Sequence, residues 1–205
     1  MIFIGPSLPQ AAAQTILDAD YRPPLQAGDL DRLPDFAEVG IIDGMLEPAV
    51  RLPLVEAKRS MERGIQLFGA ASTGALLATE LEPLGMIGVG RVYSFLCTLA
   101  EEKEDLIVVR QTTDTFTART VPLVNVVLGL LEGGRIKPIE VATLIESLRE
   151  IPLEDRSWEV ISNRLACTHG AAAKRWLQEE WPDSKAADAS FLLHLLRRNT
   201  GVHNR

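Results

Sequence analysis

Short apolar runs alternate with helix-like segments through the first ninety residues of the chain. Apolar side chains dominate residues 2–5, 39–42 and 65–68. An extended segment is expected at residues 20–24, because residues before proline avoid the α region. Helix periodicity and helix boundary residues mark the segments between them, residues 9–17, 53–63 and 73–81. Short apolar strands that alternate with helices predict a parallel sheet covered on both faces.

Beyond residue 92 the pattern becomes mostly helical. Residues 106–109 are an expected strand, and residues 121–131 fit either a helix or a strand; we favour a helix that ends at Gly133 and Gly134. Further helices are expected at residues 138–150, 155–167, 171–181 and 186–197. The prediction is an α/β fold, with a Rossmann-like parallel sheet in residues 1–92 and a mostly helical portion in residues 93–205 packed on it.

The composition narrows the functional classes. The 205 residues carry a net charge of −7, which argues against a general nucleic-acid binder. The chain shows neither a secretory leader pattern nor an apolar run long enough for a membrane span, so we expect a cytoplasmic protein. Cys97 and Cys167 have no histidine cluster near them, so we expect two buried thiols and no metal site. Gly85, Gly88 and Gly90 have the wrong order for a dinucleotide-binding loop, and we expect no cofactor.

Polar residues follow three of the expected strands. Gly5 and Ser7 follow the first run, Asp43 follows residues 39–42, and Ser72 follows residues 65–68. The carboxyl ends of parallel strands form the usual site edge of such a sheet. We therefore expect these side chains along one edge.

The most informative stretch is FGAASTGALL, residues 68–77. Its small side chains allow a strand to turn sharply into a helix and place the Ser72 hydroxyl among free backbone N–H groups. The segment Ala70-x-Ser72-x-Gly74 is one glycine short of the nucleophile elbow of hydrolases. Serine is also a preferred helix cap, so the alternative is that Ser72 only caps its helix.

The residues expected to contact substrate come from this turn, from the first strand end and from the following helix. They are Gly69, Ala71, Thr73, Gly74, Gly5, Ser7 and Glu80. Ser7 is also a reserve nucleophile, whereas Glu80 fits an ordinary exposed helix glutamate as well.

Lys58 is the expected base. It lies four residues after Leu54, on the stripe that Leu54 and Met61 mark as inward-facing, and burial of a lysine favours its neutral, basic form. The alternative is that its stem packs while its ammonium reaches water. Asp43 is expected to hold Lys58 or a partner group in place, and fits equally well as a residue that stabilises the turn before Gly44.

Several segments, in order, resemble the TfuA-like family. They are residues 4–8 (IGPSL), 20–24 (DYRPP) with Gly28 and Asp29, 40–44 (GIIDG), 68–76 (FGAASTGAL) with Glu80 and Leu81, and 85–90 (GMIGVG). The order and spacing agree over roughly residues 1–92, and the resemblance is faint beyond them, at Val124-Asn125 and residues 155–158.

The resemblance implies a partner of YcaO enzymes, which use ATP to activate backbone amides and take part in thioamidation of ribosomal peptides and proteins. Members of the family are understood to hydrolyse a thiocarboxylated sulfur carrier of the ThiS type and so release sulfide for the YcaO enzyme. A Ser–Lys pair is attributed to the family, and its serine maps onto Ser72.

The chain departs from the family pattern at two places. Relatives carry His-Lys-Glu where this chain has Leu54, Val55 and Glu56, and often carry arginine at the position of Leu77. Either Lys58, one turn later, supplies the amine, or this chain has lost the base.

These observations favour a cytoplasmic accessory hydrolase whose partners are a YcaO enzyme, a ThiS-type sulfur carrier and a precursor peptide. Ser72 is expected to attack the thiocarboxylate carbonyl while Lys58 takes its proton and nearby backbone N–H groups hold the oxyanion. The main alternative is a non-catalytic docking protein that brings the peptide or the carrier to a YcaO enzyme. A weaker alternative is a module that binds a small molecule or a nucleotide.

Overall fold

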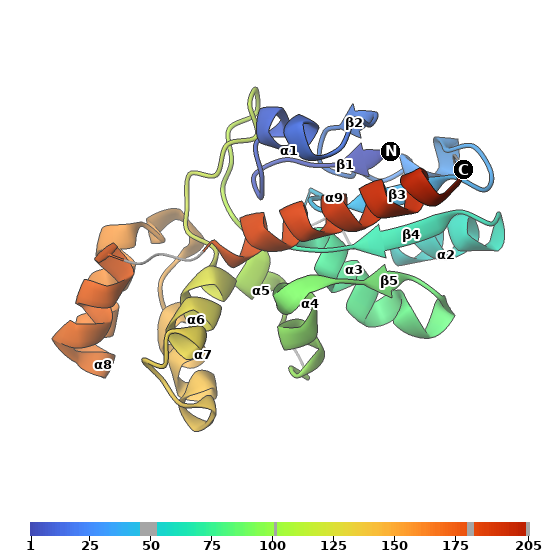
Figure 1. The fold of residues 1–205 in the computed structure, drawn as a ribbon. Coiled ribbons are helices and arrows are strands. Elements are labelled where there is room, and N and C mark those ends of the chain that lie inside the picture. The colour runs from blue at the N-terminus through green and yellow to red at the C-terminus, as the bar shows by residue number, and fades with distance from the viewer. Residues whose placement is uncertain (46–52, 101, 180–182, 204–205) are drawn as a thin grey trace.

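A five-stranded parallel sheet organises the N-terminal part of the chain (Figure 1). The computed structural model describes residues 1–45, 53–100, 102–179 and 183–203, and its strand order is β2-β1-β3-β4-β5. The strands are β1 (Ile2–Phe3), β2 (Tyr21–Arg22), β3 (Glu38–Ile41), β4 (Gln66–Gly69) and β5 (Ile87–Gly88). The central pair, β3 and β4, runs in register from Glu38 beside Gln66 to Ile41 beside Gly69. The predicted α/β class is confirmed.

Helices fill most of the remaining chain. The α-helices are α1 (Gln10–Ile16), α2 (Leu54–Glu62), α3 (Thr73–Leu81), α4 (Gly90–Cys97), α5 (Glu104–Ile107), α6 (Leu123–Glu132), α7 (Val141–Arg149), α8 (Trp158–Glu179) and α9 (Ser184–His203). Short 3-10 turns are η1 (Leu30–Arg32), η2 (Glu82–Leu84), η3 (Pro138–Glu140) and η4 (Leu153–Asp155).

Helices cover both faces of the sheet. On one face, Ile2 and Phe68 pack with Leu192 of α9 in a core that α1 also joins. On the other face, Ile41 packs with Leu77 of α3 in a core that includes α2 and η1. Neighbouring strand residues point to opposite faces, so both faces of these short strands are apolar, as the continuous apolar runs predict.

A third apolar core fills the helical half. Every side chain of α6 from Leu123 to Leu130 is buried, and residues of α4, α5, α7 and α8 pack around it. The C-terminal helix α9 contacts α6 and α4 and also α1 and β3. It therefore joins the helical half to the sheet, and Figure 1 shows it running alongside the strands.

The structure corrects three expected elements. Residues 104–107 form the short helix α5, where a strand was expected at 106–109, because a short apolar run does not distinguish a buried helix turn from a strand. Residues 85–90, where no strand is expected, contain the two-residue strand β5, which pairs with β4. The helices expected at 155–167 and 171–181 are continuous as α8 except for a kink at Gly170, whose φ is 81°; residues 180 and 181 lie outside the described residues.

Two further findings concern surface properties. Cys97 and Cys167 are exposed, so the expectation of two buried thiols is wrong. Cysteine is usually buried, but each of these residues occupies a solvent-facing position on its helix. Among the described residues, no helix has the length and apolarity that a membrane crossing requires.

Candidate active site

The polar residues that follow β1 and β3 meet at one edge of the sheet, as expected. The Asp43 carboxylate accepts hydrogen bonds from the Gly5 amide at 2.9 Å, the Ser7 amide at 3.1 Å and the Ser7 hydroxyl at 2.6 Å. Asp43 is only 1% exposed. Because all three donors belong to the segment after β1, Asp43 fixes the neighbouring strand end rather than only its own turn.

Ser72 lies at the sharp turn between β4 and α3. Ala71 has a φ of 66°, in the left-handed region, and Ser72 opens the helix with φ −129° and ψ −121°. The Ser72 hydroxyl makes no capping hydrogen bond, so the alternative that this side chain only caps α3 is wrong. Among the described residues, the amides of Ala71 and Thr73 have no hydrogen-bond partner either. The turn thus combines an unengaged hydroxyl with two backbone donors close to it in the chain.

The glycines of the turn allow a close approach of helix and strands. A Cβ atom on Gly74 would lie 1.7 Å from the carbonyl oxygen of Ile41, and one on Gly69 would lie 2.1 Å from the carbonyl oxygen of Gly74. The Thr73 hydroxyl donates to the carbonyl oxygen of Gly44 at 3.1 Å, which ties the start of α3 to the end of β3. Gly69 and Gly74 are therefore explained by packing, and this packing brings Ser72 beside the Asp43–Gly44 segment.

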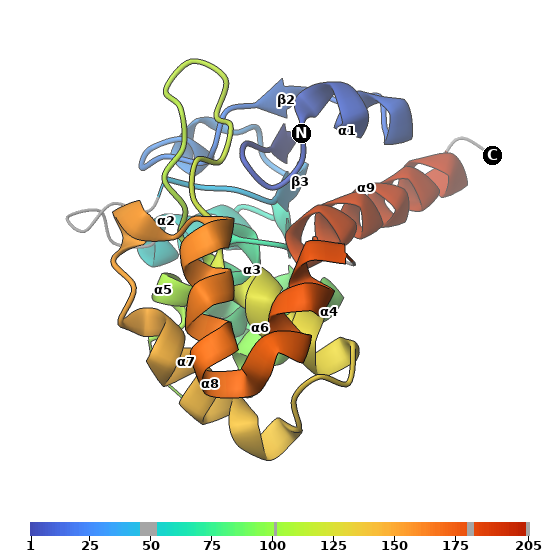
Figure 2. The same ribbon diagram turned by 90° about the vertical axis from the view of Figure 1, so that its left-hand side faces the viewer.

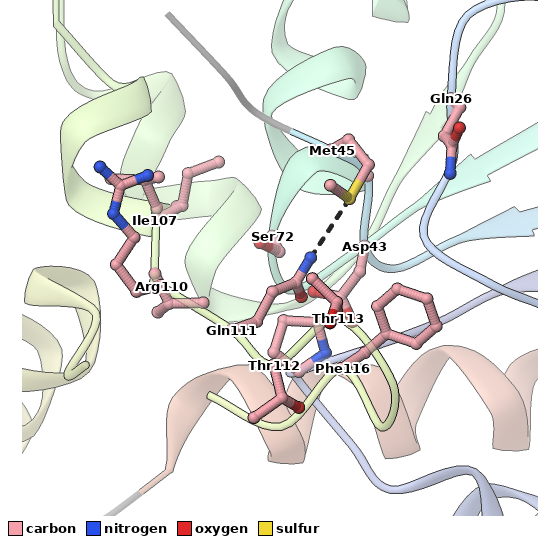
Figure 3. A pocket seen from close by; sticks show the side chains of 14 residues that line it. Gln26, Asp43, Met45, Ser72, Ile107, Arg110, Gln111, Thr112, Thr113 and Phe116 are labelled. Carbon is pink, nitrogen blue, oxygen red and sulfur yellow. Dashed lines mark hydrogen bonds between the residues drawn. The ribbon is translucent and has the colours of Figure 1, made fainter. Parts of the chain in front are cut away.

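A cavity of about 390 Å³ opens over this edge and contains Ser72 and Asp43 in its wall (Figure 3). Much of the remaining wall comes from residues 108–120, which we call the arm. The arm folds back on itself through the hydrogen bond from the Thr112 amide to the Thr117 carbonyl at 2.9 Å. It is the yellow-green loop at the top of Figure 2. No sequence pattern predicts that the arm lies at the site, because its polar residues have no periodicity.

Gln111 of the arm lines the cavity and carries an unsatisfied acceptor. Its Nε2 donates to the Met45 sulfur at 3.2 Å, whereas its Oε1 is buried and has no partner among the described residues (Figure 3). A buried acceptor without a donor is costly unless a ligand or water supplies one. The cavity wall thus combines Ser72, next to two unbonded amides in the chain, with polar side chains of the arm.

Lys58 does not reach this cavity. It is exposed, and the buried residues of α2 are Glu56, Ala57 and Ser60. The expected inward orientation of Lys58 is wrong. The inward face of α2 contains the buried polar residue Glu56, and a pattern of apolar residues alone does not predict this. The Glu56 carboxylate accepts hydrogen bonds from the amides of Gly28 at 2.8 Å and Leu30 at 2.6 Å, so the helix face that carries Glu56 turns inward.

Glu80 does not line the cavity either. It is exposed on α3, and its carboxylate lies 3.9 Å from the Lys103 ammonium. It therefore behaves as the ordinary exposed helix glutamate that the sequence allowed. Among the described residues, no group of three or more His, Cys, Asp or Glu side chains is arranged to hold a metal ion.

A lysine that the sequence did not single out lies beneath the same edge. Lys185, in the first turn of α9, is 2% exposed, and its ammonium donates to the carbonyl oxygen of Ile107 at 3.0 Å. Burial lowers the pKa of Lys185, although the charges of Asp43 and Asp183 oppose the shift. No sequence pattern marks this residue, because α9 lies far along the chain and reaches the edge only in the folded molecule.

A family model described as TfuA-like protein matches residues 43–157. The match begins at Asp43, includes Ser72 and α3, and continues through the arm and α6 to Ser157. It therefore covers the stretch beyond residue 92, where the resemblance in the sequence was faint. No curated protein matches the chain.

Proposed function

We propose that this chain, which belongs to the TfuA-like family, hydrolyses a thiocarboxylated carrier protein of the ThiS type and releases sulfide for a YcaO enzyme. The family is associated with YcaO-dependent thioamidation. The observation that carries the proposal is the Ser72 hydroxyl, which makes no capping bond and lies in the wall of a cavity. A serine retained for structure alone would be expected to use its hydroxyl as a cap.

The proposed reaction has two balanced steps. The Ser72 oxygen attacks the thiocarboxylate carbonyl, the carbon–sulfur bond breaks, and the serine proton leaves with sulfur as hydrosulfide. Water then attacks the acyl ester and restores the Ser72 hydroxyl, the carrier leaves with an ordinary carboxylate, and one proton is released to solvent. The free amides of Ala71 and Thr73 are the candidate donors to the oxygen that becomes negative in each step.

The cavity has features that suit a protein tail as substrate. An extended tail presents alternating N–H and carbonyl groups, and the arm lines the cavity with the polar residues Gln111, Thr112 and Thr113. The carrier therefore enters with its C-terminal residues in the cavity and its folded part outside, where the arm forms one wall. A small leaving group such as hydrosulfide needs little room in the cavity.

The test is sulfide release from a thiocarboxylated carrier by the wild type and by Ser72→Ala. Loss of the nucleophile is expected to lower the rate by at least about 100-fold, because removing a nucleophilic serine is among the most damaging changes to a hydrolase. Ser94→Ala is the matched control, since Ser94 is an exposed serine whose hydroxyl bonds within α4, and it should leave the rate unchanged.

Undiminished sulfide release by Ser72→Ala would reject the proposal. If the Ser72→Ala chain also supported full thioamidation by a YcaO enzyme, the docking role would be favoured instead. Urea denaturation of both variants shows that any loss is chemical rather than a failure to fold.

A further inference from the structure

Lys185 is held in place from two sides. Its backbone amide donates to the Asn125 side-chain oxygen of α6 at 3.1 Å, and its ammonium donates to the Ile107 carbonyl at 3.0 Å. Asn125 in turn donates to the Asp183 carboxylate at 2.9 Å, just before α9 begins. Among the described residues, no carboxylate forms an ion pair with the Lys185 ammonium.

A buried ammonium with a single backbone acceptor lowers stability. Removing a charge from water is expensive, and an apolar side chain of similar length would pack at this position without that cost. The penalty explains why burial lowers the pKa of Lys185. A destabilising charge that is rigidly positioned points to a functional role.

Lys185 lies next to the Ser72 cavity. It lines a second cavity of about 270 Å³ together with Ser7, and the two cavities share Pro6 and Val109 in their walls. The Ser7 hydroxyl donates to Asp43, which lines the Ser72 cavity, and the acceptor of the ammonium belongs to Ile107, which also lines it. Lys185 is therefore connected to the wall of the Ser72 cavity through Ile107 and through the Ser7–Asp43 hydrogen bond.

The charges around the cavity show what Lys185 can do there. Asp43 accepts three hydrogen bonds, which is the bonding pattern of a carboxylate anion, and it would repel a second anion nearby. Arg110, the other charged residue of the cavity wall, is paired with Glu154. The remaining charged groups of the second cavity are Asp183 and Arg119 of the arm.

We propose that Lys185 is the charge-compensating residue of the site, and that its ammonium offsets Asp43 so that the cavity accepts acyl donors that end in an anion. The inference rests on the proposed function, because a thiocarboxylate is such an anion. It assigns Lys185 to substrate selection rather than to proton transfer. It also gives this chain a cation beside the site although the family lysine position is occupied by Val55.

The experiment compares an anionic and a neutral acyl donor on the same carrier. Sulfide release from the thiocarboxylate and methanethiol release from the corresponding methyl thioester are measured for wild type, Lys185→Met and Lys185→Arg. Lys185→Met is expected to lower kcat/KM for the thiocarboxylate by at least about 10-fold and to change that for the thioester by less than about 3-fold. Lys185→Arg, which retains the cation, is expected to recover part of the selectivity.

A wild-type pH series provides a measurement that needs no variant. The ratio of thiocarboxylate to thioester turnover should fall as pH rises and Lys185 loses its proton, because the neutral amine no longer offsets Asp43. Equal losses on both donors in Lys185→Met, or no loss on either, would overturn the inference. A ratio that rises with pH would overturn it as well.

The outcome also separates this inference from the proposed function. If the wild type hydrolysed neither donor, the hydrolase proposal would fail, and binding would then decide the role of Lys185. In that case Lys185→Met should weaken binding of the carrier with a C-terminal carboxylate and leave binding of the C-terminal carboxamide unchanged. Equal binding of both carriers by wild type would reject selection for an anion.

Discussion

The residue before Ser72 is held in an unfavourable conformation. A non-glycine residue at a φ of 66° costs on the order of 1–2 kcal/mol, and Ala71 adopts it inside a fully buried turn. The Ala70 amide is bonded to Ile41 at 3.1 Å and the Ala75 amide to Ala70 at 3.2 Å, so the surrounding hydrogen bonds hold the turn in place. The consequence is a serine that begins a helix without using its hydroxyl as a cap.

Gly74 is the residue on which this geometry depends most. In Gly74→Ala the new Cβ would lie 1.7 Å from the Ile41 carbonyl oxygen, so α3 must move away from β3. We expect the free energy of unfolding to fall by about 3 kcal/mol or more, or folding to fail. Urea denaturation measures the change.

Gly134→Ala is the control for Gly74→Ala. Gly134 has a φ of 64°, and a Cβ atom there would meet no atom within 4 Å. Its substitution should therefore cost only the backbone strain, about 1–2 kcal/mol. A Gly74→Ala chain that is no less stable than Gly134→Ala would contradict the close approach of α3 to β3.

The candidate site could be predicted only in part. Ser72, Asp43 and Ser7 follow apolar strands, and the rule that parallel strands end at one edge brings them together. Lys58 was misplaced because the buried face of α2 is set by the polar residue Glu56, which the apolar pattern assigns to the surface. Lys185 could not be found, because its role depends on contacts with residues 60 and more positions away.

Among the elements, α9 and α4 are coupled by one carboxylate. The Asp188 carboxylate of α9 accepts hydrogen bonds from the amides of Arg91 at 3.0 Å and Val92 at 2.7 Å. These amides lie in the first turn of α4, where backbone donors have no acceptor within the helix. Gly90 is needed beside it, because a Cβ atom at Gly90 would lie 2.3 Å from the Asp188 carboxyl carbon. A helix of the C-terminal region thus caps a helix that follows the sheet.

Asp188→Asn should lower stability by about 0.5–2 kcal/mol, since the amide leaves one of the two α4 donors without an oxygen acceptor. Burial raises the pKa of Asp188 above its ordinary value of 3.8. At pH values between 3.8 and the raised pKa, the folded state binds more protons than the unfolded state. The contribution of Asp188 to the free energy of unfolding therefore declines as pH rises through this window. The advantage of wild type over Asp188→Asn, measured by urea denaturation across acidic pH, should therefore be larger below the window than above it. An advantage that grows with pH would contradict the assignment.

Elements with a clear pattern and a firm boundary were predicted well. Helix α3 spans Thr73–Leu81 as expected, and β1, β3 and β4 lie within one or two residues of the expected runs. The strand β5 is too short to show a hydrophobic period, and the short apolar run at α5 fits a strand as well as a helix turn. Such short elements are fixed by their packing partners rather than by their own sequence.

For the whole molecule, the site forms where three distant parts of the chain meet. The strand ends supply Ser72 and Asp43, the arm supplies Gln111, and the start of α9 supplies Lys185. The family match at residues 43–157 covers the first two parts and ends before α9. The hydrolytic core of the proposal thus lies within the family match, whereas the proposed selection for an anion depends on a residue outside it.

The most direct test is to detect the acyl ester on Ser72. Wild type is mixed with thiocarboxylated carrier, the reaction is quenched with acid at successive times, and intact masses are recorded. The account predicts a transient species whose mass equals chain plus carrier minus hydrogen sulfide, with the linkage mapped to Ser72 and absent from Ser72→Ala. Sulfide release that proceeds in both proteins at the same rate, with no such species or with the carrier linked elsewhere, would contradict it.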